Sequence, residues 1–174
     1  MKKYAVALSA LSLAFLSGTA TASKGEVRFL GAVTDTTCDV SVSVGGSVNN
    51  MIQLGTTTLN NSGSPVDFTL KANKTTSCNS LQDNAPVNIT FSGPLTSNGL
   101  GIQSGLATDA YVEVKSKNSS TSTDNNIAIK QGSDTRTFKG SDIKGNGATF
   151  SAKIVGINEK GDFQSSLAFV VAYM

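Results

Sequence analysis

The chain has 174 residues, of which 39% are hydrophobic, 15% charged and only 6% aromatic, with a formal net charge of +2. This is enough apolar material for the packed core of one domain or two small ones, and the low net charge argues against a wholly disordered chain. The sequence contains no histidine, so the usual general base and the commonest zinc ligand are missing. We therefore expect no catalytic site, metal or cofactor.

The first residues have the layout of a secretory signal peptide. Two lysines stand near the start, an apolar run covers 5–16, and residues 20–22 (Ala-Thr-Ala) provide the small-x-small pattern that signal peptidase cleaves. A transmembrane helix needs about 20 apolar residues, more than this run supplies. We predict a signal peptide over 1–22 and a mature chain beginning at Ser23. That mature chain has 12 basic and 12 acidic residues and no basic stripe for nucleic acid.

The two cysteines point to a structural disulfide. Export places Cys38 and Cys78 in an oxidising compartment, where two cysteines in a small domain most simply pair with each other. They lack the CxxC spacing of redox and metal sites. The closed loop of about 40 residues corresponds to roughly 4 kcal/mol of stabilisation in the chain-entropy model.

Strand-like alternation recurs along the mature chain, whereas helical periodicity does not. Apolar and polar residues alternate at 66–73, 87–91, 112–114 and 148–154. Turn-forming residues separate these stretches at 60–65, 97–101, 117–126, 144–147 and 158–161. Many short strands with polar connections predict a single all-β sandwich domain. The stretch 116–126 is so polar that we expect it to be an exposed loop or an excursion that connects two strands.

Both ends of the mature chain are apolar strands. Near the front, one face of an extended strand carries small or apolar residues: Gly25, Val27, Phe29, Gly31 and Val33. At the other end, one face carries Leu167, Phe169, Val171 and Tyr173. An apolar strand at a chain end either sits inside a sheet or offers unpaired N–H and C=O groups to another strand.

Alternation alone leaves two solutions open for the front strand. Burying Val27, Phe29 and Val33 is worth roughly 5 to 8 kcal/mol, so a partner groove is required. The strand can pair within its own molecule, giving a self-contained secreted sandwich, or it can be donated to another copy. Periodicity shows that a strand is half-buried but not whose sheet contains it.

The terminal segments resemble those of chaperone-usher fimbrial subunits, specifically type 1-like and enterotoxigenic major pilins of Gram-negative bacteria. The stretch 25–33 followed by Cys38 looks like the family's donor strand, with a glycine seven residues before the cysteine. The second cysteine follows the 66–73 strand, as in these pilins, and 52–55 (Ile-Gln-Leu-Gly) looks like their apolar-x-Leu-Gly element. Tyr173 is the penultimate aromatic and Gly161 the fourteenth residue from the end, both positions of the family's chaperone-recognition signature.

This resemblance implies an incomplete immunoglobulin-like β-sandwich over 35–174, preceded by a donor strand over 23–34. A periplasmic chaperone would lend a strand to the groove beside 167–173, and the next subunit's donor strand would replace it at the outer-membrane usher. Val27, Phe29 and Val33 would enter the neighbour's pockets, with Gly31 where the groove is shallow. The implied product is a fimbrium on the cell surface, a polymer with identical or related pilin subunits that is used in adhesion.

Two departures from the family pattern affect the register of the donor strand. The segment begins only about two residues after the predicted cleavage site, which leaves the first pocket to Gly25 or empty. Leu30 is apolar on the face that should point outward.

Other interpretations have weaker support. Asp109 and Glu113 could be a paired-carboxylate glycosidase site, although two acids along one strand are usually solvated charges. Gly161 reads most simply as part of a hairpin turn, and Tyr173 as a core aromatic with its hydroxyl at the rim. A subunit that itself binds a host glycan is the main functional alternative, with loops at 96–107 or 116–126 to hold the sugar; the absence of tryptophan makes a stacking platform less available.

Overall fold

The computed structural model describes residues 38–73, 78–121 and 124–174. The predicted signal peptide over 1–22 and donor segment over 23–34 lie outside this range. The elements, in chain order, are β1 (Val40–Val44), β2 (Ser47–Val48), β3 (Asn61–Ser62), β4 (Val66–Ala72), β5 (Pro86–Ser92), β6 (Leu100–Gly101), β7 (Tyr111–Ser116), β8 (Thr135–Lys139), α1 (Gly140–Lys144), β9 (Ala148–Gly156) and β10 (Ala168–Tyr173).

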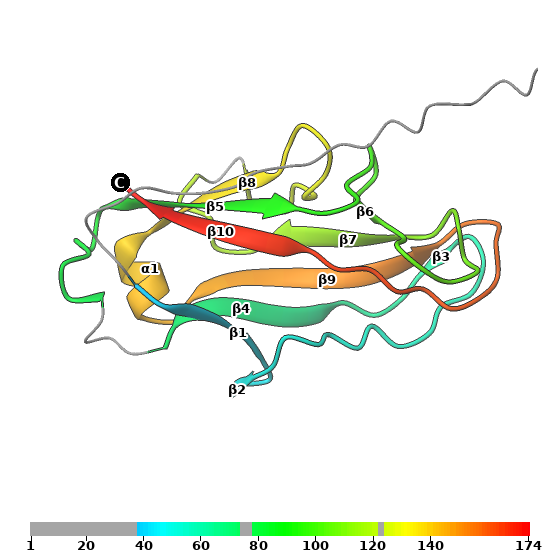
Figure 1. The fold of residues 1–174 in the computed structure, drawn as a ribbon, viewed down its shortest axis with the longest axis horizontal. Helices are drawn as coiled ribbons and strands as arrows, with labels where there is room; N and C mark the ends of the chain where they lie inside the picture. The colour runs from blue at the N-terminus through cyan, green and yellow to red at the C-terminus, as the bar shows by residue number, and fades with distance from the viewer. Residues whose placement is uncertain (1–37, 74–77, 122–123) are drawn as a thin grey trace, which may run out of the picture.

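The strands form two packed antiparallel sheets (Figure 1). The larger sheet has the order β2-β1-β4-β9-β7-β6, with β3 paired to the end of β9, and the smaller has the order β10-β5-β8. β10 therefore lies at an edge of the small sheet, beside β5. β1 lies towards one side of the large sheet, beside β4. The first and last described strands thus belong to different layers.

Aromatic side chains join the two layers at the centre of the core. Phe150 on β9 stacks on its cross-strand neighbour Phe68, with ring centroids 5.3 Å apart. The same ring meets Phe91 and Phe138 of the small sheet edge-on, at 5.3 and 5.5 Å. Edge-to-face contacts at these distances are favourable beyond the area they bury. One phenylalanine therefore anchors strands from both sheets.

The strands predicted from alternation are confirmed. The stretches 66–73, 87–91, 112–114, 148–154 and 167–173 correspond to β4, β5, β7, β9 and β10. In β4, β5 and β7 the inward positions are buried and the outward positions are more exposed, as a half-buried strand requires. The described residues also include one short helix, α1, which is too brief to give helical periodicity in the sequence.

The stretch 116–126 leads from the end of β7 towards β8, as the strand-connecting alternative expects, but part of it is not exposed. Ser116 is fully buried and Ser119 is 7% exposed. Ser119 Oγ and the Ser120 N–H both donate to the Thr137 carbonyl, at 2.9 Å each. Asn118 accepts from the Thr149 N–H at 2.7 Å. Polar residues pack here because their hydrogen-bonding groups are satisfied by neighbouring backbone.

These bonds also occupy part of one edge of the small sheet. The Thr137 carbonyl lies on β8, on the side away from β5, and the hydrogen bonds from Ser119 and Ser120 occupy it. An occupied edge is a poor template for another strand. Within the described ranges, no helix is long and apolar enough to cross a membrane.

Candidate functional site

The open edge of β10 is the first component of the site. β10 pairs with β5 in the register Phe169–Phe91, Val171–Ile89 and Tyr173–Val87. Across residues 38–73, 78–121 and 124–174, no strand pairs with the other edge of β10. The main chain on that side is therefore available to an added strand.

The inward side chains of β10 are incompletely covered. Phe169, Val171 and Tyr173 share a face with Phe91, Ile89 and Val87, because cross-strand partners lie on the same side of a sheet. The β5 residues are 0 to 2% exposed, whereas those of β10 are only partly buried although they pack on the same core. The core is thus closed on the β5 side of β10 and open on the other.

β1 shows the same asymmetry in the opposite layer. Val40, Val42 and Val44 pair with Ala72, Leu70 and Phe68, all of which are buried. The three valines are partly buried and pack on the edge of the core. Two strands in different sheets therefore present apolar faces to a common space that neither one fills.

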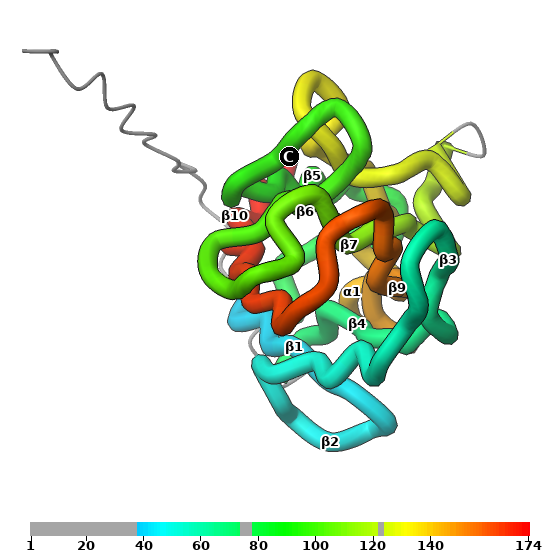
Figure 2. The backbone as a smooth tube through the Cα atoms, turned by 90° about the vertical axis from the view of Figure 1, so that its right-hand side faces the viewer, coloured from blue at the N-terminus to red at the C-terminus, as the bar shows by residue number. Residues whose placement is uncertain are grey.

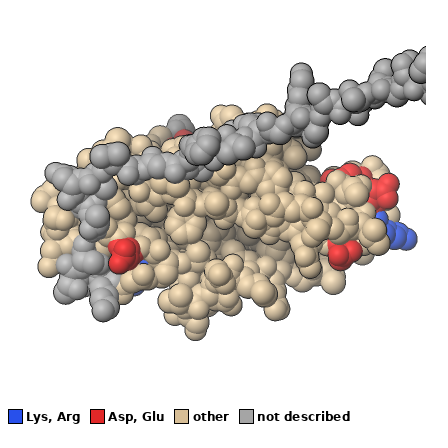
Figure 3. All heavy atoms as spheres, viewed as in Figure 1, with Lys and Arg blue, Asp and Glu red and all other residues tan. Residues whose placement is uncertain are grey.

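A long groove occupies that space, with a cavity volume of about 1660 Å³. Its floor is core, including Leu70, Phe91 and Val112, and its β10 side includes Phe169. The segment 50–59, which follows β2, lines the opposite side with Ile52 and Leu54. Small-ligand sites hold roughly 300 to 1,000 Å³, so this groove is larger and fits an extended peptide. Figure 3 shows the same side of the molecule, with charged side chains mainly towards its two ends.

Tyr173 lies at the C-terminal end of β10, beyond the residues that line the groove. Its hydroxyl donates to the Cys38 carbonyl at 2.5 Å, joining the end of β10 to the residues that precede β1. Cys38 is held by a disulfide to Cys78, with Cα atoms 4.8 Å apart, which confirms the predicted pairing. Both cysteines are buried. The disulfide therefore fixes the carbonyl that receives the last aromatic side chain.

Burial raises the pKa of Tyr173 to about 12, and the negative charge of Asp39 adds to this effect. Between the ordinary value near 10 and about 12, the unfolded chain loses the phenolic proton while the folded chain keeps it. The contribution of this group to stability is therefore constant below pH 10 and falls as the pH rises to 12.

We expect the substitution Tyr173→Phe to lower the free energy of unfolding by about 1 kcal/mol at neutral pH. Between pH 10 and 12, the Tyr173→Phe variant should lose less stability than the native chain. Urea unfolding at a series of pH values, with Tyr111→Phe as the control, measures this difference.

Two loops pack tightly at the other end of the groove. Residues 102–107 and 161–166 lie side by side (Figure 2) and exchange backbone hydrogen bonds, including Gln164 N–H to the Ser104 carbonyl at 2.9 Å. A Cβ on Gly161 would stand 2.4 Å from the Leu106 Cβ. Glycine is thus required at 161 because a side chain there would clash with Leu106 in the neighbouring loop. This tertiary requirement supplements its predicted place in a turn.

The candidate carboxylate pair has structural partners instead of a shared site. Asp109 accepts the backbone N–H groups of Asn158 and Glu159 at 2.9 and 3.1 Å, which fixes the turn before Gly161. Burial opposes and hydrogen bonds favour the ionised form of Asp109, and the balance leaves its pKa below the usual value. Glu113 forms ion pairs with Lys115 and Lys153 at 3.0 and 3.2 Å. Each acid is accounted for by the turn or sheet around it.

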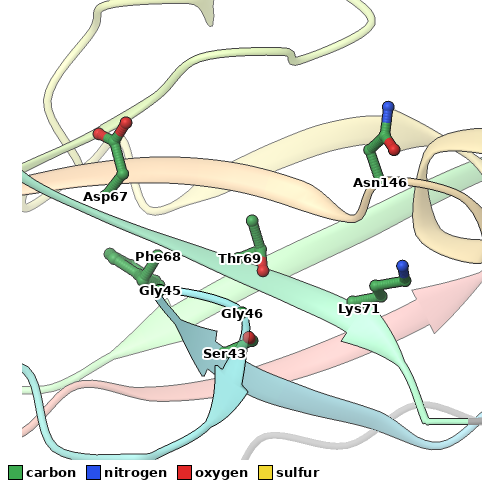
Figure 4. A pocket seen from close by; sticks show the side chains of 8 residues that line it. All are labelled: Ser43, Gly45, Gly46, Asp67, Phe68, Thr69, Lys71 and Asn146. Carbon is green, nitrogen blue, oxygen red and sulfur yellow. The ribbon is translucent and has the colours of Figure 1, made fainter.

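A smaller hollow of about 340 Å³ lies over the outward face of β1 and β4. Figure 4 shows Asp67, Thr69 and Lys71 spread along β4, with Ser43 on β1, so that these side chains do not meet at one point. Asp67 already pairs with Lys117 at 2.6 Å. The hollow has no convergent chemistry comparable to the apolar groove.

Of the described residues that the sequence proposed for the acceptor groove, Leu167, Phe169 and Gly161 line the cavity. Val171 and Tyr173 lie further along β10, where they pack on the core outside the cavity lining. The predicted donor residues Val27, Phe29, Gly31 and Val33 fall outside the described residues. Sequence reasoning missed the opposite wall, although the Val-Ser-Val-Ser-Val alternation of 40–44 is a strand signal that could have found it.

Comparison with known proteins agrees with this geometry. No protein-family model matches the chain. The F107 fimbrial protein of Escherichia coli is 36% identical over 172 residues, which cover 98% of this chain and 99% of that protein. The chain belongs to the fimbrial subunit family. This confirms the resemblance seen in the sequence, and with it the prediction of a structural subunit of a fimbria.

Two further proteins are similar to the fimbrial subunit. The K99 fimbrial protein of Escherichia coli is 35% identical over 71 residues, covering 41% of this chain and 39% of that protein. The crystal structure of the P pilus rod subunit PapA superposes with a TM-score of 0.50 at 19% identity, covering 86% of the fimbrial subunit and 100% of PapA. At that identity the likeness concerns the fold alone, and it confirms the predicted immunoglobulin-like sandwich.

Proposed function

We propose that this fimbrial subunit polymerises by strand donation, with residues 23–34 of one copy filling the groove between β1 and β10 of the next. The observation that carries this proposal is the incomplete core. The inward faces of β1 and β10 are only partly buried, beside a groove of about 1660 Å³. Val27, Phe29 and Val33 are the side chains that enter the groove, and Gly31 passes where it is shallow.

The dimensions and chemistry of the donor segment support this assignment. Residues 25–33 in an extended conformation span about 30 Å at about 3.3 Å per residue. The open edge of β10 supplies main-chain partners, while the apolar walls accept side chains from alternate positions of the added strand. Burial of the three large donor side chains contributes roughly 5 to 8 kcal/mol.

The same groove requires protection before assembly. An exposed edge strand with an apolar face is an aggregation hazard, and β10 has both features within the described structure. A periplasmic chaperone that lends a strand to the groove meets this need, with Gly161 and Tyr173 in the recognition segment. Exchange for the donor strand of the next subunit then takes place at the outer-membrane usher.

Export through the periplasm and display on the cell surface complete the proposed role. The Cys38–Cys78 disulfide suits an oxidising compartment. The subunit acts as a non-catalytic building block of a surface fibre used in adhesion. The alternative of a host-glycan site gains no support from the described part of 116–126, where Asn118 and Ser119 bond to the chain itself.

A change confined to the inward face of the donor segment tests this proposal. In the full-length chain with Val27, Phe29 and Val33 all replaced by Ser, we expect fibres to be lost because roughly 5 to 8 kcal/mol of apolar burial disappears. Electron microscopy and the yield of high-mass polymer measure the loss.

The matched control changes the outward face of the same segment. Glu26→Ser, Arg28→Ser and Leu30→Ser together should leave assembly largely intact, because these side chains point away from the groove. Normal fibres from the inward variant, or equal loss from both variants, would show that the segment does not act as a donor strand.

A further inference from the structure

The groove is not uniform along β10. Phe169 lines the open cavity, as do residues 159–168 before it, but Val171 and Tyr173 are not among its lining residues. At that end the Tyr173 side chain crosses from the small sheet to the Cys38 carbonyl. At this end of β10 the Tyr173 side chain therefore reaches from the small sheet to the residues before β1.

This crossing is fixed at both ends. Tyr173 is held in register with Val87 on β5. Cys38 is 7% exposed and bonded to the fully buried Cys78, and the next residue accepts the Asn73 N–H at 2.8 Å. Moving the ring would therefore break a hydrogen bond to a carbonyl that the disulfide and β4 hold in place. A buried acceptor left without its donor is costly.

The donor strand lacks a side chain at the matching position. Every strand pair in the described structure is antiparallel, and an antiparallel donor places its front end at the end of β10. Within 25–33, its first inward residue is Gly25. Opposite Tyr173, Gly25 leaves room for the ring, whereas a slip of two residues would drive Val27 into it.

We propose that Tyr173 acts as a stop that sets the register of the donor strand, with Gly25 as its counterpart. This register places Phe29 opposite Phe169, and Gly31 opposite Leu167, whose side chain already projects into the cavity. Each small donor residue then meets a large acceptor residue. The inference rests on the proposed strand donation and adds the residue pair that determines the alignment.

The test is a double-mutant cycle in fibres of the full-length chain, where every subunit is both donor and acceptor. Gly25→Leu alone should lower the midpoint of thermal dissociation by about 3 to 10 °C, because the new side chain overpacks against Tyr173. Tyr173→Ala alone should also lower it. In the double variant the leucine introduced by Gly25→Leu occupies the space left by the ring, so the midpoint should lie above that of Tyr173→Ala alone. Additive losses would overturn the proposal.

Further variants keep the test informative if Tyr173→Ala does not assemble. In the native background, the loss should grow from Gly25→Ala to Gly25→Leu, while Glu26→Leu on the outward face leaves the midpoint unchanged. A Tyr173→Phe acceptor should still be destabilised by Gly25→Leu, because the bulk of the ring remains. If the Gly25 substitutions leave the midpoint of thermal dissociation unchanged, the proposed register is wrong, but strand donation is not contradicted. If fibres also form when Val27, Phe29 and Val33 are replaced by Ser, strand donation itself is contradicted.

Discussion

A chain of residues 35–174 is expected to unfold at low temperature by itself and to gain at least about 10 °C in its unfolding midpoint when a peptide of residues 23–35 is added. The peptide buries Val27, Phe29 and Val33, worth roughly 5 to 8 kcal/mol. That is comparable to the whole stability of an ordinary domain, about 5 to 15 kcal/mol. One kcal/mol corresponds to about 2 to 4 °C in a domain of this size. Calorimetry or fluorescence-detected unfolding with and without peptide measures the shift.

The comparison peptide carries serine at 27, 29 and 33 and keeps the same length and charge. It should give little stabilisation, because main-chain pairing along β10 contributes only about 0.5 to 1.5 kcal/mol for each hydrogen bond. A truncated chain that is stable, monomeric and unaffected by either peptide would contradict strand donation. The self-contained sandwich would then be the better description.

Removal of the disulfide is expected to have the second-largest effect. Cys38→Ala combined with Cys78→Ala opens a loop with a sequence separation of 40 residues, which corresponds to about 4 kcal/mol of lost stability. The change also frees the segment whose carbonyl receives the Tyr173 hydroxyl. We therefore expect the groove to become less well formed in the variant. In the chain of residues 35–174, the peptide of residues 23–35 should stabilise the double-alanine variant less than it stabilises the protein with the disulfide.

Urea unfolding of the oxidised, reduced and double-alanine proteins measures the stability loss. Intact mass with and without reductant establishes that the bond is present before the experiment. Tyr173→Phe is the matched control, because it removes the hydrogen bond to Cys38 and retains the disulfide, and its smaller effect separates the two contributions. Equal stability of the oxidised and reduced proteins would contradict a stabilising role for the bond.

The sequence by itself determined the fold class, the central strands and one wall of the site. Alternation locates β4, β5, β7, β9 and β10 because each has one face in the core and one in solvent. It misses β8, where Arg136 occupies an inward position. That guanidinium donates to the Ile127 and Ala128 carbonyls at 3.1 and 3.0 Å, and burial lowers its pKa. A buried cation bonded to backbone carbonyls has no signature in a hydrophobic pattern.

The tertiary structure decided which residues surround β10, the wall of the groove that the sequence predicts. The contact between Tyr173 and Cys38 joins residues 135 positions apart, and Gly161 owes its tight packing to Leu106 in another loop. Sequence periodicity carries information about neighbours along a strand, where side chains repeat every second residue. It carries none about which strand from the opposite sheet faces them. The position of β1 opposite β10, across an open groove, therefore follows only from the packing of the two sheets.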